Sequence, residues 1–217
     1  MAADFRPHRV AGALAAAALV CSAIGGCAAV ADPAPVPHAA GAGLTAGAAR
    51  AALARLRVAP EDTGAHYRRA DWPHWDRVAG ECDARAETLK TQGAGVTTGP
   101  HCRITGGRWT SRYDGVAVAD PGALDIDHMV PLAEAARSGT RGWSRAQREA
   151  YANDTRLVLV AVTAKSNRAK GDQDPARWLP ALDRCGYVAQ WVAVKAKYAM
   201  TVDPAEHDAI AGILRRC

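Results

Sequence analysis

Two short stretches, about forty residues apart, constrain the fold more than any other part of the chain. The first, Asp125 to Pro131, reads as an extended segment, because its apolar residues suit a buried strand and its final proline can open a helix. The second, Asn167 to Asp172, follows the apolar, strand-length run 157–162, and Thr163 is placed to cap a helix. The sequence therefore predicts two strands that pair and a helix directly after the second.

Polar side chains gather where these elements are expected to meet. Asp127 and His128 lie at the predicted strand end, and Asn167 projects from the predicted helix. Carboxylate and amide oxygens suit a divalent cation such as Mg²⁺, and so few ligands would leave it open to phosphate and water. An imidazole with the ordinary pKa of about 6.5 can accept a proton from that water. These residue types indicate hydrolysis of a phosphodiester.

Three further side chains in these stretches are candidates for supporting roles. Arg168 and Lys170 are expected near Asn167 on the helix, where they could hold a phosphate. Asp125 shares a strand face with Asp127, because side chains alternate along a strand. Asp125 could therefore position the metal ligand Asp127 without binding the ion itself. A hydrogen bond from Asp125 to nearby backbone is the alternative.

Residues 1–31 have the features of a signal peptide. Two arginines precede an apolar run at 10–20, which is too short to span a membrane, and small residues follow. Cleavage is expected either after residue 31, at an Ala-x-Ala site, or after residue 26, at a sequence that resembles a lipobox. The first option gives a secreted protein, and the second a cell-surface lipoprotein anchored at Cys27.

The remaining chain divides into a tether and one domain. Residues 32–47 are rich in Ala, Gly and Pro, so they bury little apolar surface and are expected to be flexible. Residues 48–217 have the length of a single domain and contain all six tryptophans, which predicts a substantial core. The formal charge of +5 permits a polyanionic partner without requiring one.

The cysteines indicate two disulfides. Four remain once the signal peptide is processed, namely Cys82, Cys102, Cys185 and Cys217. An even number in an exported chain favours disulfides, with three possible pairings. We favour Cys82 with Cys102 and Cys185 with Cys217, because each pair closes a loop within one half of the domain. Zinc is the competing use, but no Cys-x-x-Cys spacing supports it.

The other predicted elements place helices around the small antiparallel pair, an α+β fold. Helices are expected at 48–57, at 72–90, at 131–137, at 144–151, in a short segment from Asp174 that carries Trp178, at 187–200 and from Asp203 toward the C-terminus. A hairpin is expected at 101–113, with its turn at Gly106-Gly107.

Several motifs together resemble the HNH, or ββα-metal, endonucleases, and specifically their exported GmrSD-like branch. The core motifs are Asp127-His128-x-Val130-Pro131 and Asn167-Arg168-x-Lys170-Gly171-Asp172. The wider ones are Cys82-Asp83-x-Arg85, Gly107-x-Trp109, Tyr113-Asp114-Gly115, Tyr151-Ala152-Asn153-Asp154 and Trp178-Leu179-Pro180. The likeness covers roughly residues 50 to 217, and its spread over many positions argues against chance agreement.

The resemblance implies a ββα-metal core and a specific division of roles. It implies that His128 is the general base and that Asp127 and Asn167 bind a divalent cation, Mg²⁺ or alternatively Mn²⁺. The implied reaction is hydrolysis of DNA that leaves 5′-phosphate ends. Low sequence preference is expected, because no recognition helix or basic arm is visible, and no obligate protein partner is evident.

One position departs from the family pattern. HNH enzymes usually carry a middle asparagine that steadies the base, and Val158 stands in its place. Asn153, Asp154 or a backbone carbonyl could orient the His128 ring instead, although Asn153-Asp154 could simply end a helix. The departure motivates an alternative function, a module that binds nucleic acid or cell-wall polymer without cutting it. A metallopeptidase is disfavoured, because the chain lacks His-x-x-x-His.

Overall fold

The computed structural model describes residues 43–217, which form one compact α+β unit. The predicted signal peptide, Cys27 and most of the predicted tether lie outside the described residues. Helix α1 (Ala46–Leu53) begins two residues earlier than the predicted domain, because the Thr45 side chain accepts a hydrogen bond from the Ala48 backbone and caps it. Within the described part, no helix has the length and apolar character needed to cross a membrane.

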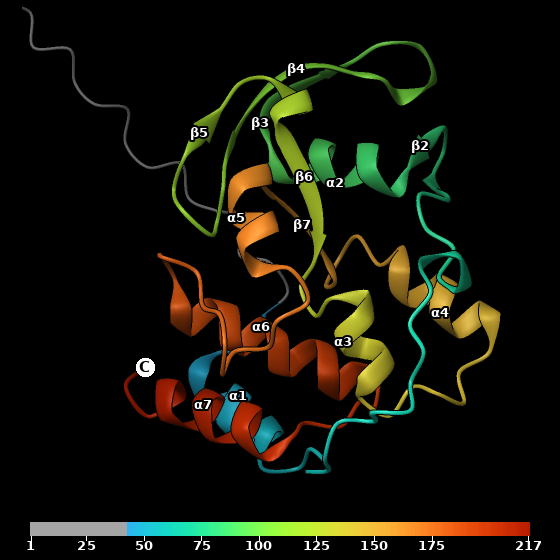
Figure 1. The fold of residues 1–217 in the computed structure, drawn as a ribbon. Helices are drawn as coiled ribbons and strands as arrows, with labels where there is room; N and C mark the ends of the chain where they lie inside the picture. The colour runs from blue at the N-terminus through green and yellow to red at the C-terminus, as the bar shows by residue number, and fades with distance from the viewer. Residues whose placement is uncertain (1–42) are drawn as a thin grey trace, which may run out of the picture. The chain divides into compact units, whose positions relative to one another are not determined.

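The predicted strand, strand and helix are present and adjacent (Figure 1). Strand β6 (Leu124–His128) pairs antiparallel with β7 (Leu159–Thr163), so that Asp127 lies opposite Val160. Four of the five β7 residues are buried, which explains the continuous apolar run in the sequence. Helix α5 (Ala164–Lys170) follows at once, capped by the Thr163 side chain as predicted, and packs on both strands.

The remaining elements surround this unit. Their bounds are η1 Arg69–Asp71, β1 Arg77–Ala79, β2 Cys82–Asp83, α2 Ala84–Gln92, β3 Ala94–Thr98, η2 Pro100–Cys102, β4 Ile104–Thr110, β5 Ala117–Val118, η3 Pro121–Ala123, α3 Leu132–Arg137, α4 Arg145–Ala152, α6 Arg184–Lys197 and α7 Pro204–Leu214. Strands β3, β4 and β5 form a second antiparallel sheet. Helices α1, α6 and α7 pack together, and α6 is buried along most of its length. Figure 1 shows the β6–β7 pair between this helical group and the three-stranded sheet.

Other predicted features are confirmed. Ser144 and Asp203 each begin a helix with a complete capping box. Both favoured disulfides are present, Cys82–Cys102 and Cys185–Cys217. The predicted α+β class, with helices around a small antiparallel pair, describes the fold.

The predicted helix at 72–90 is wrong in its first half. Pro73 has no backbone N–H and disfavours the helical conformation for Trp72, and Trp75 takes a left-handed φ of 67°. The chain instead makes a turn and the short strand β1, and helix α2 begins only at Ala84, where the Asp83 side chain caps it. The apparent helical spacing of the aromatic residues was therefore coincidental.

The predicted hairpin at 101–113 and the short helix from Asp174 are also wrong. Strand β4 continues through Gly107 without a turn. Glycine is required there because the Trp109 ring packs against it, and a Cβ would come within 2.7 Å of that ring.

The residues after Asp174 form a turn, in which the Asp174 carboxylate accepts a hydrogen bond from the Ala176 backbone. Pro180 disfavours a helix that would continue through Leu179.

Candidate active site

The polar ends of β6 and α5 open onto a pocket of about 490 Å³. Five residues singled out from the sequence line it, namely Asp125, Asp127, His128, Asn167 and Arg168. Four further chemically distinctive residues line it that the sequence analysis did not select, namely Tyr67, Arg69, Trp75 and Arg85. The pocket therefore combines acids, an amide, an imidazole, arginines and aromatic rings.

An acid and an amide meet at this pocket, as the sequence analysis expected, but the acid is Asp125. The Asn167 Nδ2 donates a hydrogen bond of 3.0 Å to the Asp125 Oδ2. Both side chains are half-buried, Asp125 on β6 and Asn167 on α5. Together they offer hard oxygen atoms next to open space, which is the donor chemistry that Mg²⁺ prefers.

Asp127 is held in a buried ion pair. The Lys170 Nζ lies 3.0 and 2.7 Å from the two Asp127 carboxylate oxygens, and the Tyr113 hydroxyl donates a third hydrogen bond of 2.6 Å. Burial raises the pKa of Asp127 and lowers the pKa of Lys170, while the attraction between the two charges opposes both shifts. Both oxygens of Asp127 are thus already engaged by the chain itself.

Lys170 does not line the pocket. Its side chain is fully buried, and its ammonium donates a further hydrogen bond of 2.9 Å to the His128 backbone carbonyl. The arrangement satisfies all three of its donors within the protein. Lys170 therefore fixes the end of β6 and is not in reach of a phosphate in the pocket.

His128 is buried and oriented by backbone. Its Nε2 lies 3.0 Å from the Ala152 carbonyl oxygen, which can only accept, so Nε2 carries the proton and Nδ1 keeps a free lone pair. Burial lowers the pKa of His128 to about 3, because the charged form loses its hydration. A backbone carbonyl, one of the alternatives considered from the sequence, thus orients this ring in its neutral form.

Asn153 and Asp154 contact other parts of the chain. The Asn153 Oδ1 accepts from the Asp76 backbone N–H at 2.9 Å, and its Nδ2 donates to the Pro73 carbonyl at 3.1 Å and to the Asp76 carboxylate at 2.9 Å. Asn153 therefore ties the end of α4 to the turn that precedes β1. Asp154 instead accepts hydrogen bonds from Lys197 and Tyr198.

Three arginines line the pocket, and the sequence analysis singled out only Arg168 for this role. Arg168 is exposed and forms no ion pair within residues 43–217. The Arg85 Nη2 donates hydrogen bonds of 3.0 Å to the Leu124 and Pro121 carbonyls, which fixes it beside the start of β6. Arg69 lies in η1, and its Nη2 is 3.1 Å from the His74 Nε2. Arg85 stands in one of the motifs behind the family resemblance, so a signal for it existed, whereas Arg69 carries none.

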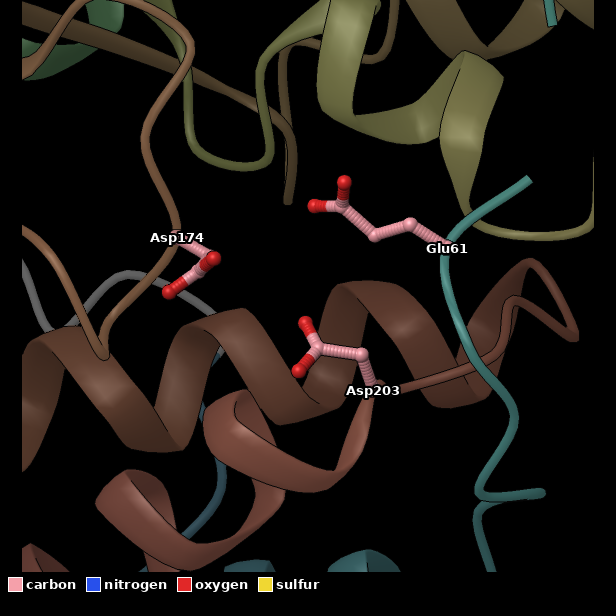
Figure 2. Close-up of side chains that lie close together, drawn as sticks. All are labelled: Glu61, Asp174 and Asp203. Carbon is pink, nitrogen blue, oxygen red and sulfur yellow. The ribbon is translucent and has the colours of Figure 1, made fainter. Parts of the chain in front are cut away.

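A second group of acids lies apart from this pocket (Figure 2). Glu61, Asp174 and Asp203 point toward one another, with ligand atoms within 4.8 Å. Each has a role within the chain: Glu61 lies 3.4 Å from Arg137, Asp174 closes its turn and Asp203 caps α7. We therefore assign no cation to this group.

Comparison with known proteins identifies the family. A family model described as "GmrSD restriction endonucleases, C-terminal domain" matches residues 86–213, and the chain belongs to this family. Membership indicates a nuclease-type hydrolase. The chain is also similar to an "Uncharacterized secreted protein" of Arthroderma benhamiae, with 38% identity over 191 residues that cover 87% of this chain and 93% of that protein. No solved structure matches the chain.

Proposed function

We propose that the protein is an exported, metal-dependent HNH endonuclease that hydrolyses phosphodiester bonds of DNA with little sequence preference. One observation carries the proposal: His128 opens onto the same pocket as the Asp125–Asn167 pair and three arginines. A proton acceptor, oxygen ligands for a cation and phosphate-binding groups are the parts that such a reaction requires. Family membership supports the same class of chemistry.

Asp125 and Asn167 fit a divalent cation, Mg²⁺ or Mn²⁺. The proposal moves the carboxylate ligand from Asp127 to Asp125, because Lys170 and Tyr113 occupy both oxygens of Asp127. Rotation of the Asn167 amide would present its oxygen in place of its nitrogen. When bound, the cation would stabilise negative charge on the phosphate and on the leaving oxygen.

The chain's own residues supply the other parts of the reaction. The His128 Nδ1 would take a proton from the attacking water as the water oxygen bonds to phosphorus and the bond to the leaving oxygen breaks. The Ala152 carbonyl would hold the His128 ring in place and would stabilise the positive charge that the ring gains. Arg69, Arg85 and Arg168, which all line the pocket, would hold the phosphate.

Export rests on two observations besides the predicted signal peptide. Two disulfides suit an oxidising compartment, and the relative from Arthroderma benhamiae is described as secreted. The mass of the mature N-terminus would distinguish a free protein that begins after residue 31 from one lipidated at Cys27. An intact leader in the mature protein would contradict export by cleavage.

The nuclease proposal is tested with plasmid DNA and purified protein, in Mg²⁺ or Mn²⁺ and in chelator. Wild type should nick the plasmid only with metal, and His128→Ala should lower the rate roughly 10²- to 10⁴-fold, the usual contribution of a general base. His101→Ala is the matched control, because its side chain is exposed and lies outside the pocket.

Two outcomes would contradict the proposal in different ways. Full activity of His128→Ala would remove His128 from the mechanism. A wild type that binds DNA and cuts neither DNA nor RNA in either metal would favour the non-catalytic binding module.

A further inference from the structure

The segment between η1 and β1, whose Trp75 lies beside His128 at the pocket, has a feature that the proposed chemistry does not use. Trp75 is only half-buried, lines the pocket and lies with its ring centroid 6.3 Å from that of His128. Its φ of 67° is an outlier for so bulky a residue, and such backbone strain persists only where the surroundings enforce it.

The surroundings of Trp75 do enforce its position. Asn153 binds the backbone on both sides of the residue, at Pro73 and Asp76. His74 is fixed as well, since its Nδ1 lies 2.8 Å from the Trp72 carbonyl and its ring contacts Trp75 edge-on. Asn153 directly follows Ala152, whose carbonyl orients His128. One helix end thus positions both the imidazole and the indole.

The indole packs against the core cluster with only part of its surface and stays partly exposed. Trp72, Trp109 and Trp191 are at most 2% exposed and serve as core residues. Trp75 instead contacts only His74 and His128 among the aromatic rings of residues 43–217, and neither ring lies parallel to it. No arginine or lysine of that part of the chain lies over its face.

We propose that Trp75 forms a stacking subsite for an unpaired nucleobase next to the scissile phosphate. The inference rests on the proposed nuclease function and adds a substrate preference to it. An aromatic face beside phosphate-binding arginines is how proteins hold single strands without reading their sequence. Arg69, in η1 before Trp75, lines the same pocket, so it would bind the phosphate attached to the stacked base.

The geometry favours single strands over duplex. Within a duplex both faces of each internal base are covered by its neighbours, so a base must unstack before it can meet Trp75. A single strand avoids most of that cost. We therefore expect single-stranded DNA to be cleaved roughly tenfold faster than duplex of the same sequence, or more.

The test uses full-length processed protein and oligonucleotides in which a single phosphodiester is flanked by methylphosphonate linkages. An abasic residue is placed on one side of that phosphodiester or on the other. For wild type, one of the two abasic substrates should be cleaved roughly 5- to 150-fold more slowly than the intact one, the range expected for loss of one stacked base. Trp75→Ala should cleave all three at the same slow rate, and Trp75→Phe should retain part of the difference.

Failure of the stacking subsite and failure of the nuclease proposal would give different cleavage results. If wild type cleaves intact and abasic substrates equally, the stacking subsite is overturned while the nuclease proposal stands, and this comparison needs no variant that folds. If wild type cleaves nothing, the nuclease proposal fails, and fluorescence anisotropy with the same oligonucleotides in chelator decides the subsite. An abasic penalty on binding that Trp75→Ala removes would support stacking, and its absence would overturn it.

Discussion

At the scale of single residues, the buried Asp127–Lys170 pair has a consequence for stability that is separate from catalysis. We expect Lys170→Met to lower the free energy of unfolding by about 3–5 kcal/mol, because it leaves the Asp127 carboxylate buried without its cation. Chemical denaturation measures the change. Adding Asp127→Asn should recover much of the loss, since the second change removes the unpaired charge. If the double variant loses as much free energy of unfolding as the two single variants together, Asp127 and Lys170 do not stabilise the fold as a pair.

The two acids of β6 can be distinguished by their effect on metal binding. We expect Asp125→Asn to weaken Mn²⁺ binding at least tenfold, because it removes the only charged ligand proposed. Asp127→Asn keeps the Tyr113 contact and should change Mn²⁺ affinity much less. Electron paramagnetic resonance of free Mn²⁺ gives both affinities without an activity assay. The reverse order would restore Asp127 as the ligand, as the sequence first suggested.

The difference between these acids marks how far sequence reasoning reaches. Alternation along a strand shows that Asp125 and Asp127 share a face, and the Asn167 motif shows that a helix lies opposite. Which acid is covered depends on Tyr113 and Lys170, and neither contact follows from local sequence. The class of protein, a nuclease-type hydrolase, could therefore be predicted from the sequence, whereas only the packing shows that Asp127 is engaged by other side chains of the chain.

At the scale of elements, prediction succeeded where one local rule decided the outcome. The β6–β7–α5 unit follows from two apolar runs and a threonine cap, each of which is a local signal in the sequence. It failed at 72–90 and at Gly106-Gly107. In the first case Pro73 competes with an apparent helical period, and in the second the glycines accommodate the Trp109 ring rather than a turn. Both errors therefore arise where two local signals compete, a proline against an apparent helical period and a glycine pair against a neighbouring aromatic ring.

A buried cluster that joins three helices predicts a pH dependence. Lys195 of α6 binds both Glu134 of α3 and Glu206 of α7, at 3.0 and 2.6 Å. Glu134 also pairs with Arg137. Burial opposes ionisation of Glu134, but the two cations and its hydrogen bonds together hold its pKa below the ordinary value, whereas burial raises the pKa of Glu206 to about 7. Between pH 4.5 and about 7 the folded state therefore holds a proton on Glu206 that the unfolded state has released.

Glu206 therefore lowers the free energy of unfolding as the pH rises. The stability contributed by protonated Glu206 is fully present below pH 4.5 and is lost as the pH rises through about 7. Glu206→Gln should thus become more stable relative to wild type by about 1.4 kcal/mol per pH unit across this window. Denaturation of both proteins at a series of pH values measures the difference. Glu134→Gln is the matched control, because the pKa of Glu134 is lowered: its stability relative to wild type should fall only as the pH rises toward 4.5 and should stay constant between pH 4.5 and 7.

At the scale of the whole molecule, the two disulfides should differ in what their loss does. Cys185–Cys217 joins the start of α6 to the end of the chain, and neither residue lines the pocket. Cys82–Cys102 lies next to Asp83, which caps α2, and α2 carries Arg85 into the pocket. The first bridge is therefore expected to affect stability alone, and the second to affect the site as well.

The double change Cys185→Ser/Cys217→Ser tests this division. It opens a loop of 32 residues, so restored freedom of the unfolded chain should lower the free energy of unfolding by about 3–4 kcal/mol. Activity per folded molecule should stay at the wild-type level. Cys82→Ser/Cys102→Ser should lower stability by a similar amount and should also raise KM, because Arg85 loses the support that places it beside β6. Steady-state kinetics below the melting transition of each variant separate the two effects, and an equal rise in KM for both variants would show that the bridges act only through global stability.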